Sequence, residues 1–564
     1  MKRILLSSVA VVLFAASAFA QTDGNTASKP SDSGSTKSAT APANTTKKAP
    51  VAESSSVAPA AAATTSATTA AAETTAAPVQ QQKAESSSTN PASATQTSIA
   101  KLSTSPDDKA AADGAATFSH SDTQMDQGDQ SPLFFKIGGA EFSPLGFMDF
   151  TTVFRSTDVG SGIGTSFGSI PFNGASPAGQ LSEVRFSAQN SRIGMKVDAN
   201  PGDFKVRGYI EADFLGNAAA NLEVGSHSDT LRMRLYWVDV QRGKWEILAG
   251  QSWSMMTPNR VGISPMPGDI FYSQDMDTNY QVGLVWLRTP GFRVVLHVND
   301  QVAWGFALED PEQYTGGLTT FPASFTSADQ AQVDDSGGNS KTPNKAPDIM
   351  SKLAFDTHPN GGGRNFHIEI AGLYRAFRLN TPGLGNVTSS GGGGSINANL
   401  ELFKNFHLIA NTFWSDGGGR YIFQLGPDFT VNVNGAGNFV PSPIHAGSGI
   451  GGFEYQFNPK SMLYAYYGGA YFGRDFQATT GTGGTITYSG YGYPGSGSGQ
   501  NRAIQEPTIG VIQTFWKNRN YGDLKLITQV SYLSRNPWSN TATSGNANSA
   551  HLGMAFVDLR YDLP

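Results

Sequence analysis

The sequence predicts an all-β protein, a transmembrane antiparallel β-barrel of about 16 strands. Three observations predict this fold. Apolar and polar residues alternate along successive segments, short and long connections alternate between those segments, and the segments have the length of a tilted strand that crosses a bilayer. Such a sheet has lipid on one face and water on the other.

The alternation is clearest in two consecutive segments, 204–214 and 231–237. The first carries Phe204, Val206, Gly208, Ile210, Ala212 and Phe214 on one face and Lys205, Arg207, Tyr209, Glu211 and Asp213 on the other. In the second, Leu231, Met233, Leu235 and Trp237 are expected to face lipid, and Arg232, Arg234 and Tyr236 to face water. These charged faces are too polar for a dry core. The final segment, 552–563, alternates in the same way.

The connections alternate between short turns and long loops. Turn residues predict short connections at 200–203, 241–244, 289–291, 358–363, 404–406, 458–460 and 517–522. Long loops are predicted at 156–180, 215–229, 255–278, 301–345, 380–394, 416–443, 473–502 and 534–550. Seven turns and eight loops join sixteen strands, an even number typical of bacterial outer-membrane barrels.

Strand length and orientation agree with this count. Segments such as 291–299, 406–415 and 462–472 are close to the roughly 9 to 11 residues of a membrane-crossing strand. Short turns belong to the periplasm, so both ends of the barrel are expected there. Trp253, Trp286, Trp414 and Trp516 stand near strand ends, where an aromatic girdle is expected. A secreted soluble β-sandwich also explains alternation, but not this rhythm of connections.

Three regions divide the chain. Residues 1–20 read as a signal peptide, with Lys2 and Arg3, an apolar stretch over 4–14 and a small-residue ending at Ala20. Residues 21–130 form a low-complexity tail rich in Ala, Ser and Thr, predicted to be disordered in the periplasm because it cannot bury a core. Residues 131–564 form the barrel, which contains no cysteine.

Composition argues against several classes of function. The net charge of −6 is modest, and the sequence has no basic patch typical of nucleic-acid binding. The lipid-facing strand faces predict outer-membrane lipid as the surroundings of the barrel. Asp275 and Asp277 alone make a weak calcium site, and the histidines have no metal-ligand spacing, so no metal or cofactor is predicted. His367 and His407 lack an accompanying Gly-x-Ser-x-Gly motif, and we predict no enzyme.

The predicted barrel is wide enough for an aqueous channel. The loop 255–278 occupies the position where porins fold a loop into the lumen, and it carries the expected constriction residues Arg260, Asp269, Asp275 and Asp277. The expected pore-lining cations are Arg192, Lys205, Arg207, Arg232, Arg234 and Arg293. Fixed cations attract anions, and arginine binds carboxylates through two parallel hydrogen bonds. Small anionic solutes are therefore the predicted cargo. Alternatively, these arginines only pair with Glu211, Asp213 and Glu246.

Four segments resemble the DcaP-like outer-membrane porins: SRIGMKV at 191–197, GYIEADFLG at 208–216, LRMRL at 231–235 and LAGQSWS at 248–254. The resemblance implies a homotrimeric channel for passive uptake of small anions, dicarboxylates in particular, with Arg192, Arg232 and Arg234 at an arginine-rich constriction. The chain departs from the family in its long tail, which lacks heptads, and in its ending Tyr561-Asp562-Leu563-Pro564 without a terminal aromatic residue.

The leading hypothesis is a passive outer-membrane porin for small hydrophilic anions. A sugar-specific channel remains open, and it requires a row of lumen aromatics such as Tyr236, Tyr374 or Tyr466. A structural or adhesion barrel also remains open, with the tail in contact with peptidoglycan. Removal of 21–130 separates this reading from a channel, because a channel keeps its conductance without the tail.

Overall fold

The computed structural model describes residues 132–564 except 173–176, 217–224, 226, 267–275, 317, 334–341, 360–362, 424, 482 and 540–548. The contacts within the chain divide it into two compact units, and all described residues belong to the unit that contains 113–564. The predicted signal peptide and tail lie outside the described residues.

One 18-stranded antiparallel sheet closes on itself through β2 (Ala140–Arg155) and β22 (Ala550–Asp562). Along one edge of β2, β1 (Phe135–Ile137) pairs ahead of β22. Along the other edge, β4 (Arg192–Ala199) and β3 (Glu183–Ser187) pair with the first and last parts of β2. On one edge of β2, β1 and β22 therefore occupy a single strand position, and on the other edge β3 and β4 do the same. The 18 strands of the sheet thus fill 16 positions around the barrel, and the predicted number is confirmed.

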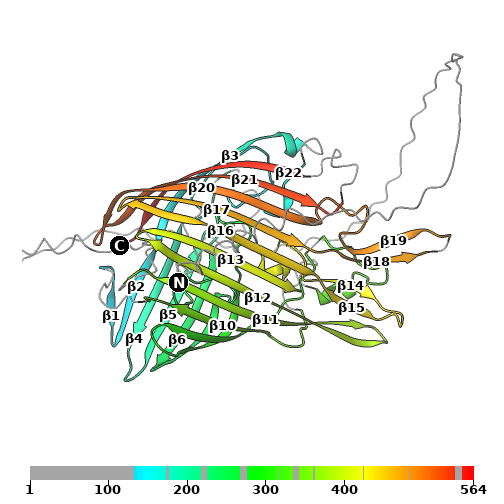
Figure 1. Ribbon diagram of the computed structural model, residues 1–564, viewed down its shortest axis with the longest axis horizontal. Helices are drawn as coiled ribbons and strands as arrows, with labels where there is room; N and C mark the ends of the chain where they lie inside the picture. The colour runs from blue at the N-terminus through cyan, green and yellow to red at the C-terminus, as the bar shows by residue number, and fades with distance from the viewer. Residues whose placement is uncertain are drawn as a thin grey trace, which may run out of the picture. The chain divides into compact units, whose positions relative to one another are not determined.

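The other strands of the barrel pair with their neighbours in chain order and run obliquely around the wall (Figure 1). They are β5 (Lys205–Asp213), β6 (Arg232–Arg242), β7 (Trp245–Trp253), β8 (Arg288–His297), β9 (Val302–Glu309), β10 (Asp348–Asp356), β11 (Phe366–Thr381), β12 (Gly385–Phe403), β13 (Phe406–Asp416), β16 (His445–Asn458), β17 (Ser461–Phe472), β20 (Asn501–Asn518) and β21 (Gly522–Pro537).

The long loops contain their own short elements. Two hairpins form separate two-stranded sheets, β14 (Phe429–Val433) with β15 (Phe439–Pro443) and β18 (Asp475–Thr480) with β19 (Ile486–Tyr491). Single 3₁₀ turns occur at η2 (Phe167–Ser169), η3 (Pro177–Gln180), η5 (Asp329–Gln332) and η6 (Gly419–Tyr421). In the described part of the chain, no helix is long and apolar enough to cross a membrane.

Three predicted connections are wrong, those at 289–291, 301–345 and 380–394; the loop predicted at 301–345 includes β9, which pairs with β8 and β10. The turn placed at 289–291 lies inside β8, and the chain turns instead between β8 and β9. Pro290 is tolerated there because the pairing with β9 begins only at Gly291. The loop placed at 380–394 is largely the first part of β12, which pairs residue by residue with β11. Glycine-rich sequence suggested a loop, but a ladder uses backbone groups, which glycine supplies as other residues do.

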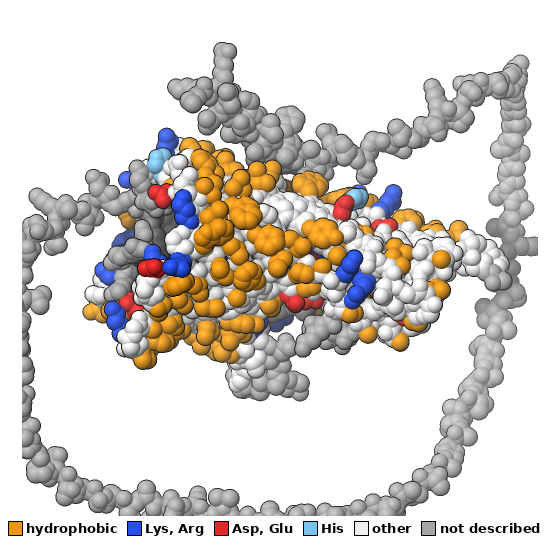
Figure 2. All heavy atoms as spheres, turned by 90° about the horizontal axis from the view of Figure 1, so that it is seen from below, with side chains coloured by type: hydrophobic (Ala, Val, Ile, Leu, Met, Phe, Trp, Pro, Cys, Tyr) orange, Lys and Arg blue, Asp and Glu red, His pale blue; other side chains and the backbone are white. Residues whose placement is uncertain are grey.

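The outer face of the barrel is apolar. Figure 2 shows hydrophobic side chains over the middle of one face, with most charged side chains toward its ends. Exposed residues on barrel strands include Phe150, Ile210, Val238, Ile370, Ile509, Val557 and Leu559. The alternate positions are polar and buried, as at Asp149, Glu211, Asp239, Glu369, Glu506 and Asp558. Lipid-facing and lumen-facing residues therefore alternate, as in a transmembrane barrel.

A β-bulge reverses the predicted faces of β6. Ala212 of β5 pairs with Met233 and Glu211 pairs with Leu235, so Arg234 is the extra residue. Arg234 and Leu235 are both buried, at 2% and 0% exposure, whereas Tyr236 and Val238 are exposed. Each inserted residue shifts the later residues to the other face. The prediction for β6 is therefore right before the bulge and wrong after it.

The tryptophans divide between the two faces. Trp414 and Trp516 are exposed, as expected for an outer girdle, but Trp253 and Trp286 are buried. These two indole rings contact each other, with centroids 5.5 Å apart. Trp253 ends β7 and Trp286 precedes β8, so the pair marks the base of the loop 254–287.

Candidate functional site

The described parts of the loop 254–287, residues 254–266 and 276–287, lie inside the barrel and contact strands far from β7 and β8. The Arg260 guanidinium donates to both carboxylate oxygens of Glu454 in β16, at 3.1 and 3.0 Å. The backbone N–H of Gly262 donates to Asp356 in β10 at 2.9 Å. The N–H of Val282 donates to Glu506 in β20, also at 2.9 Å. The loop begins after β7, so these bonds tie it across the lumen.

Glycines in the far wall make room for the loop backbone. Gly283 has φ +94°, and a Cβ there would collide with the carbonyl oxygen of Gly449 in β16. A Cβ at Gly468 in β17 would collide with the carbonyl oxygen of Val282. The backbones approach more closely than side chains permit, which is a use that glycine serves well.

The loop also brings apolar side chains into the lumen. Met255, Met256, Met276, Leu284 and Val285 are buried in the main hydrophobic cluster. This cluster also includes Tyr421 and Ile422 from the loop that contains η6, and Trp286 forms a parallel bridge with Ile422. Two loops therefore pack together inside the wall and narrow the lumen, and the alternating pattern of the strands does not predict this contact.

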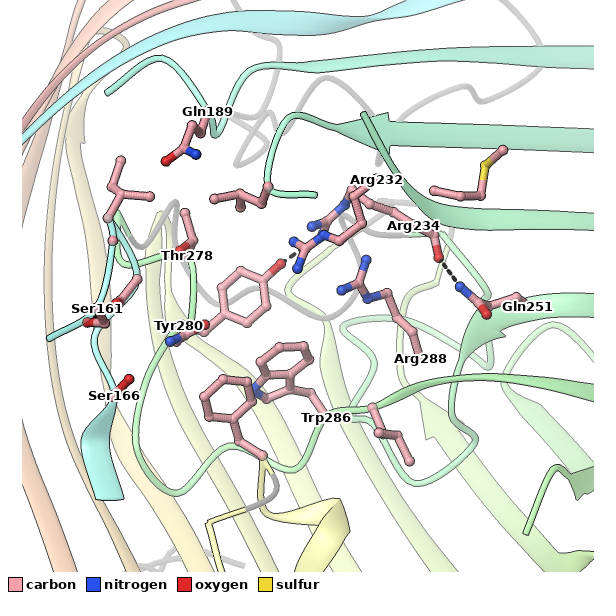
Figure 3. Close-up of a pocket in the computed structure, with 18 residues that line it drawn as sticks. Ser161, Ser166, Gln189, Arg232, Arg234, Gln251, Thr278, Tyr280, Trp286 and Arg288 are labelled. Carbon is pink, nitrogen blue, oxygen red and sulfur yellow. Dashed lines mark hydrogen bonds between the residues drawn. The ribbon is translucent and has the colours of Figure 1, made fainter. Parts of the chain in front are cut away.

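A cavity of about 520 Å³ remains between the loop and the wall. Its lining comes from the starts of β6 and β8, from β7, from the loops before β3 and β8, and from Gln189, Leu215 and Phe423 in three other connections (Figure 3). The residues labelled in that view are Ser161, Ser166, Gln189, Arg232, Arg234, Gln251, Thr278, Tyr280, Trp286 and Arg288. The cavity thus has a cationic side formed by β6 and β8, and it faces aromatic rings of the loop.

Arg234 occupies the centre of a hydrogen-bond network. Its Nε donates to Glu211 at 2.6 Å and its Nη1 to Asp213 at 2.7 Å, both on β5. Its Nη2 donates to the Tyr280 hydroxyl at 2.9 Å. The bulge at Arg234 and the carboxylates of Glu211 and Asp213 therefore hold the guanidinium so that its Nη2 points toward the loop 254–287.

Two further arginines surround this centre. Arg232 binds Asp213 through Nε at 3.0 Å and through Nη2 at 2.7 Å. Arg192 lies 3.9 Å from Glu211 and donates to the Tyr280 hydroxyl at 3.5 Å. The Gln251 amide donates to the Arg234 carbonyl oxygen at 2.7 Å, which ties β7 to the same network.

Arg288 is the fourth arginine of the cluster and differs from the others. No carboxylate of the described residues forms an ion pair with it, and its buried Nη1 has no hydrogen-bond partner among them. Its guanidinium carbon is 5.5 Å from the centre of the Trp253 ring. Among the described residues, four arginines (Arg192, Arg232, Arg234 and Arg288) face two carboxylates (Glu211 and Asp213), so positive charge is in excess in this part of the structure.

Aromatic rings form the opposite side of the cavity. Tyr280 meets Trp286 edge to face at 4.6 Å, and Trp286 stacks on Phe423 at 4.5 Å. The buried indole N–H of Trp286 has no hydrogen-bond partner among the described residues. Two donors of the lining residues, Trp286 Nε1 and Arg288 Nη1, are therefore unfilled: each is buried and has no hydrogen-bond partner among the described residues.

The Tyr280 hydroxyl is affected by this charge. Burial by itself raises the pKa of a phenol, but the positive charges of Arg234, Arg192 and Arg288 oppose it and leave the pKa of Tyr280 below its usual value. The environment of the cavity therefore favours negative charge at the position of this oxygen.

The predicted site residues fall into two groups. Arg192, Arg232 and Arg234 lie together in the arginine cluster. Lys205 is exposed at the start of β5, Arg207 pairs with Asp198 at 2.7 Å, and Arg293 donates to Ser252 at 2.9 Å. These three lie elsewhere on the wall.

The predicted constriction residues also separate. Arg260 ties the loop to β16, as described above. Asp277 is buried and accepts hydrogen bonds from the backbone N–H groups of Thr165 and Asn279, at 3.0 and 2.8 Å, so it holds the loop in shape. Asp269 and Asp275 lie outside the described residues.

Two residues of the cluster are absent from the sequence prediction. Arg288 directly precedes the turn wrongly placed at 289–291, so it was not assigned to a strand face. Tyr280 lies just beyond the predicted loop, and only the fold of that loop brings it to Arg234. Correct placement of β8 would not by itself have identified Arg288, because Arg288 lies five residues before the inward Arg293 and is therefore in the opposite phase of the alternation.

The histidines that suggested other chemistry have structural partners. His367 contacts Asp356 at 3.0 Å, and His407 contacts Asn399 at 2.9 Å. Across the residues that the structure describes, no group of three or more His, Cys, Asp or Glu side chains could hold a metal ion.

Comparison with known proteins finds similarity in structure. No protein-family model matches the chain, and no curated protein matches its sequence. The outer-membrane channel DcaP of Acinetobacter baumannii superposes with a TM-score of 0.53 at 16% identity, over 76% of this chain and 99% of that one.

Two other solved structures have lower scores. OmpF of Salmonella typhi in complex with daunomycin has a TM-score of 0.42 at 11% identity, over 76% of this chain and 99% of that one. The anion-selective porin from Comamonas acidovorans has a TM-score of 0.41 at 12% identity, over 75% and 99%. By its structure, the chain has the fold of the DcaP outer-membrane channel, a porin-type β-barrel.

Proposed function

We propose that this protein is an outer-membrane porin that passes small anionic solutes by passive diffusion, and that the cavity beside Arg234 selects them. The observation that carries the proposal is the excess of arginine over carboxylate around a cavity with unfilled donors. Fixed cations in a narrow lumen raise the local concentration of anions and lower the barrier to their entry.

A carboxylate is the chemical group that fits these donors. Arg288 has a buried N–H without a partner, and a guanidinium binds a carboxylate through two parallel hydrogen bonds. Arg232 keeps 37% of its side chain exposed although it pairs with Asp213. A dicarboxylate could place one group at each arginine, and a cavity of about 520 Å³ has room for such a small molecule.

The apolar outer face supports a location of the barrel in the outer membrane, and the lengths of the connections support its orientation there. The ends of β2 and β22 that carry the chain termini of the barrel lie on the side of the short turns. Short turns face the periplasm in outer-membrane barrels, so we place both barrel termini there. We further propose a homotrimer, which three-step closure of the channel in a bilayer would support.

The sugar-channel alternative has less support. Tyr236 and Tyr374 are exposed on the outer face, so they do not line the lumen. Tyr466 is buried and donates to Glu454 at 2.7 Å. The row of aromatics named for a sugar path therefore does not form from these three residues. The adhesion alternative concerns residues 21–130, which lie outside the described residues.

The test is the conductance of the refolded protein in planar bilayers under a gradient of potassium chloride. An anion-selective pore gives a reversal potential with the sign of chloride permeation, and succinate added to one side reduces the chloride current. A cation-selective reversal potential would contradict the proposal. A bilayer that stays silent with protein shown to be folded by its heat-modifiable gel mobility would also contradict it.

A further inference from the structure

Tyr280 holds an unusual backbone conformation inside the barrel. Its φ is +64°, in the left-handed region that side-chain-bearing residues rarely adopt. The residue is 5% exposed, and its N–H donates to the Asp277 carbonyl oxygen at 2.8 Å. Strain of this kind persists where surrounding contacts determine it, and it clusters at binding sites.

The surrounding contacts direct the phenol at the arginines. The ring packs edge to face on Trp286 at 4.6 Å and on Trp253 at 6.2 Å. The hydroxyl then reaches Arg234 Nη2 at 2.9 Å and Arg192 Nη2 at 3.5 Å. Figure 3 shows the Tyr280 hydroxyl directed toward the guanidinium groups at the edge of the cavity.

The Tyr280 hydroxyl accepts from the one Arg234 nitrogen that does not bind a carboxylate of the barrel wall. Glu211 and Asp213 take Nε and Nη1 of Arg234, and Nη2 is directed to the phenol. Without the hydroxyl, Arg234 Nη2 and Arg288 Nη1 would both lack an acceptor at the same cavity. Two such donors on separate guanidinium groups suit an anionic oxygen group.

We propose that Tyr280 is a specificity-determining residue, whose hydroxyl occupies the solute position on Arg234 and must be displaced by a solute carboxylate. This inference rests on the proposed function. A neutral phenol is a weaker acceptor for guanidinium than a carboxylate, whose hydrogen bonds are assisted by charge. A carboxylate therefore replaces the hydroxyl, whereas a neutral polar solute gains nothing by doing so.

The substitution Tyr280→Phe removes the hydroxyl and keeps the ring that packs on Trp286. The concentration of succinate that halves the chloride current should fall by about five- to tenfold, because the competitor for a charged donor is gone. Tyr464→Phe is the matched control. Tyr464 is a buried lumen tyrosine whose hydroxyl donates to the neutral Gln529 amide oxygen at 2.8 Å, and its loss should leave the succinate block unchanged.

Two results would overturn the inference. Weaker block in Tyr280→Phe would make the hydroxyl a ligand of the solute, and unchanged block would mean that it does not compete. Tyr280→Ala gives a second reading if the first variant folds poorly, and it should also tighten the block. These results on the variants can be told apart from failure of the proposed function. If the proposed function is wrong, the unaltered protein itself has no anion-selective reversal potential.

Discussion

The backbone carbonyl of Val282, inside the barrel, lies against Gly468 of β17 so closely that a Cβ at position 468 would collide with its oxygen. The N–H of Val282 is held at the same time by Glu506 in β20, at 2.9 Å. At Val282, the loop is therefore held against the far wall by a hydrogen bond to Glu506 and by the absence of a side chain at position 468.

Gly468→Ala should move the loop away from the wall and increase the single-channel conductance. Overpacking of this kind typically costs about 1–3 kcal/mol of unfolding free energy. Gly469→Ala is the matched control, because a Cβ there meets its nearest atom, the Ile504 carbonyl oxygen, at an ordinary 3.8 Å. Equal conductance in the two variants would show that the loop does not limit the pore.

Arg288→Gln should reduce anion preference with little effect on folding. Arg288 forms no ion pair in the described part of the chain, so its removal leaves no carboxylate without a partner. The reversal potential should move toward zero, while the unfolding free energy should change by less than the roughly 3–5 kcal/mol expected when a buried ion pair loses one partner. An unaltered reversal potential would remove Arg288 from the selecting site.

Arg234→Gln should instead impair both selectivity and stability. Glu211 and Asp213 are buried, and loss of Arg234 takes a charged partner from each. Removal of one partner from a buried ion pair costs about 3–5 kcal/mol. Thermal unfolding, followed by heat-modifiable gel mobility, measures this difference. Stability equal to that of Arg288→Gln would contradict the assigned network.

Anion preference should fall as the pH rises through the pKa of Tyr280. Arg234, Arg192 and Arg288 hold this pKa below its ordinary value of 10.0, so the phenolate forms earlier and cancels one positive charge. The folded-state pKa is depressed, so ionisation also adds stability above it, and that contribution is lost as pH falls. Reversal potentials between about pH 7 and pH 10 measure the first effect.

The control for this titration is Tyr280→Phe, which lacks the phenol. The groups that face Tyr280 are Arg192 on β4, Glu211 and Asp213 on β5, Arg234 on β6 and Arg288 on β8. The variant should keep its anion preference across the same range. An identical decline in the variant would assign the titration to another group.

Deletion of residues 21–130 should leave the conductance and reversal potential unchanged. The barrel closes through β2 and β22, which both lie within 131–564. A channel formed by the barrel alone therefore does not depend on the tail. Bilayer recordings of the deleted protein test this, and cell-wall association of the two proteins tests the adhesion alternative. Loss of conductance in folded, deleted protein would give the tail a role in the channel.

The strand pattern could be predicted where the alternation is regular. In β22, Val557 and Leu559 are exposed while Asp558 and Arg560 are buried, as expected. The pattern failed on β6 after Arg234, because a bulge depends on the pairing with β5. It failed at Pro290 because turn-forming residues also occur where a strand has no partner on one side.

The sequence by itself determined the wall of this protein: the all-β class, the number of strands and most of the lipid-facing positions. These follow from a period of two residues and from turn residues, which are local properties of the chain. Only the tertiary structure decided the interior. Arg260 and Glu454 are 194 residues apart, and Tyr280 meets Arg234 only because the loop folds inward. Contacts over such distances depend on closure of the barrel and on the fit of the loop to its glycines, and no local pattern contains them.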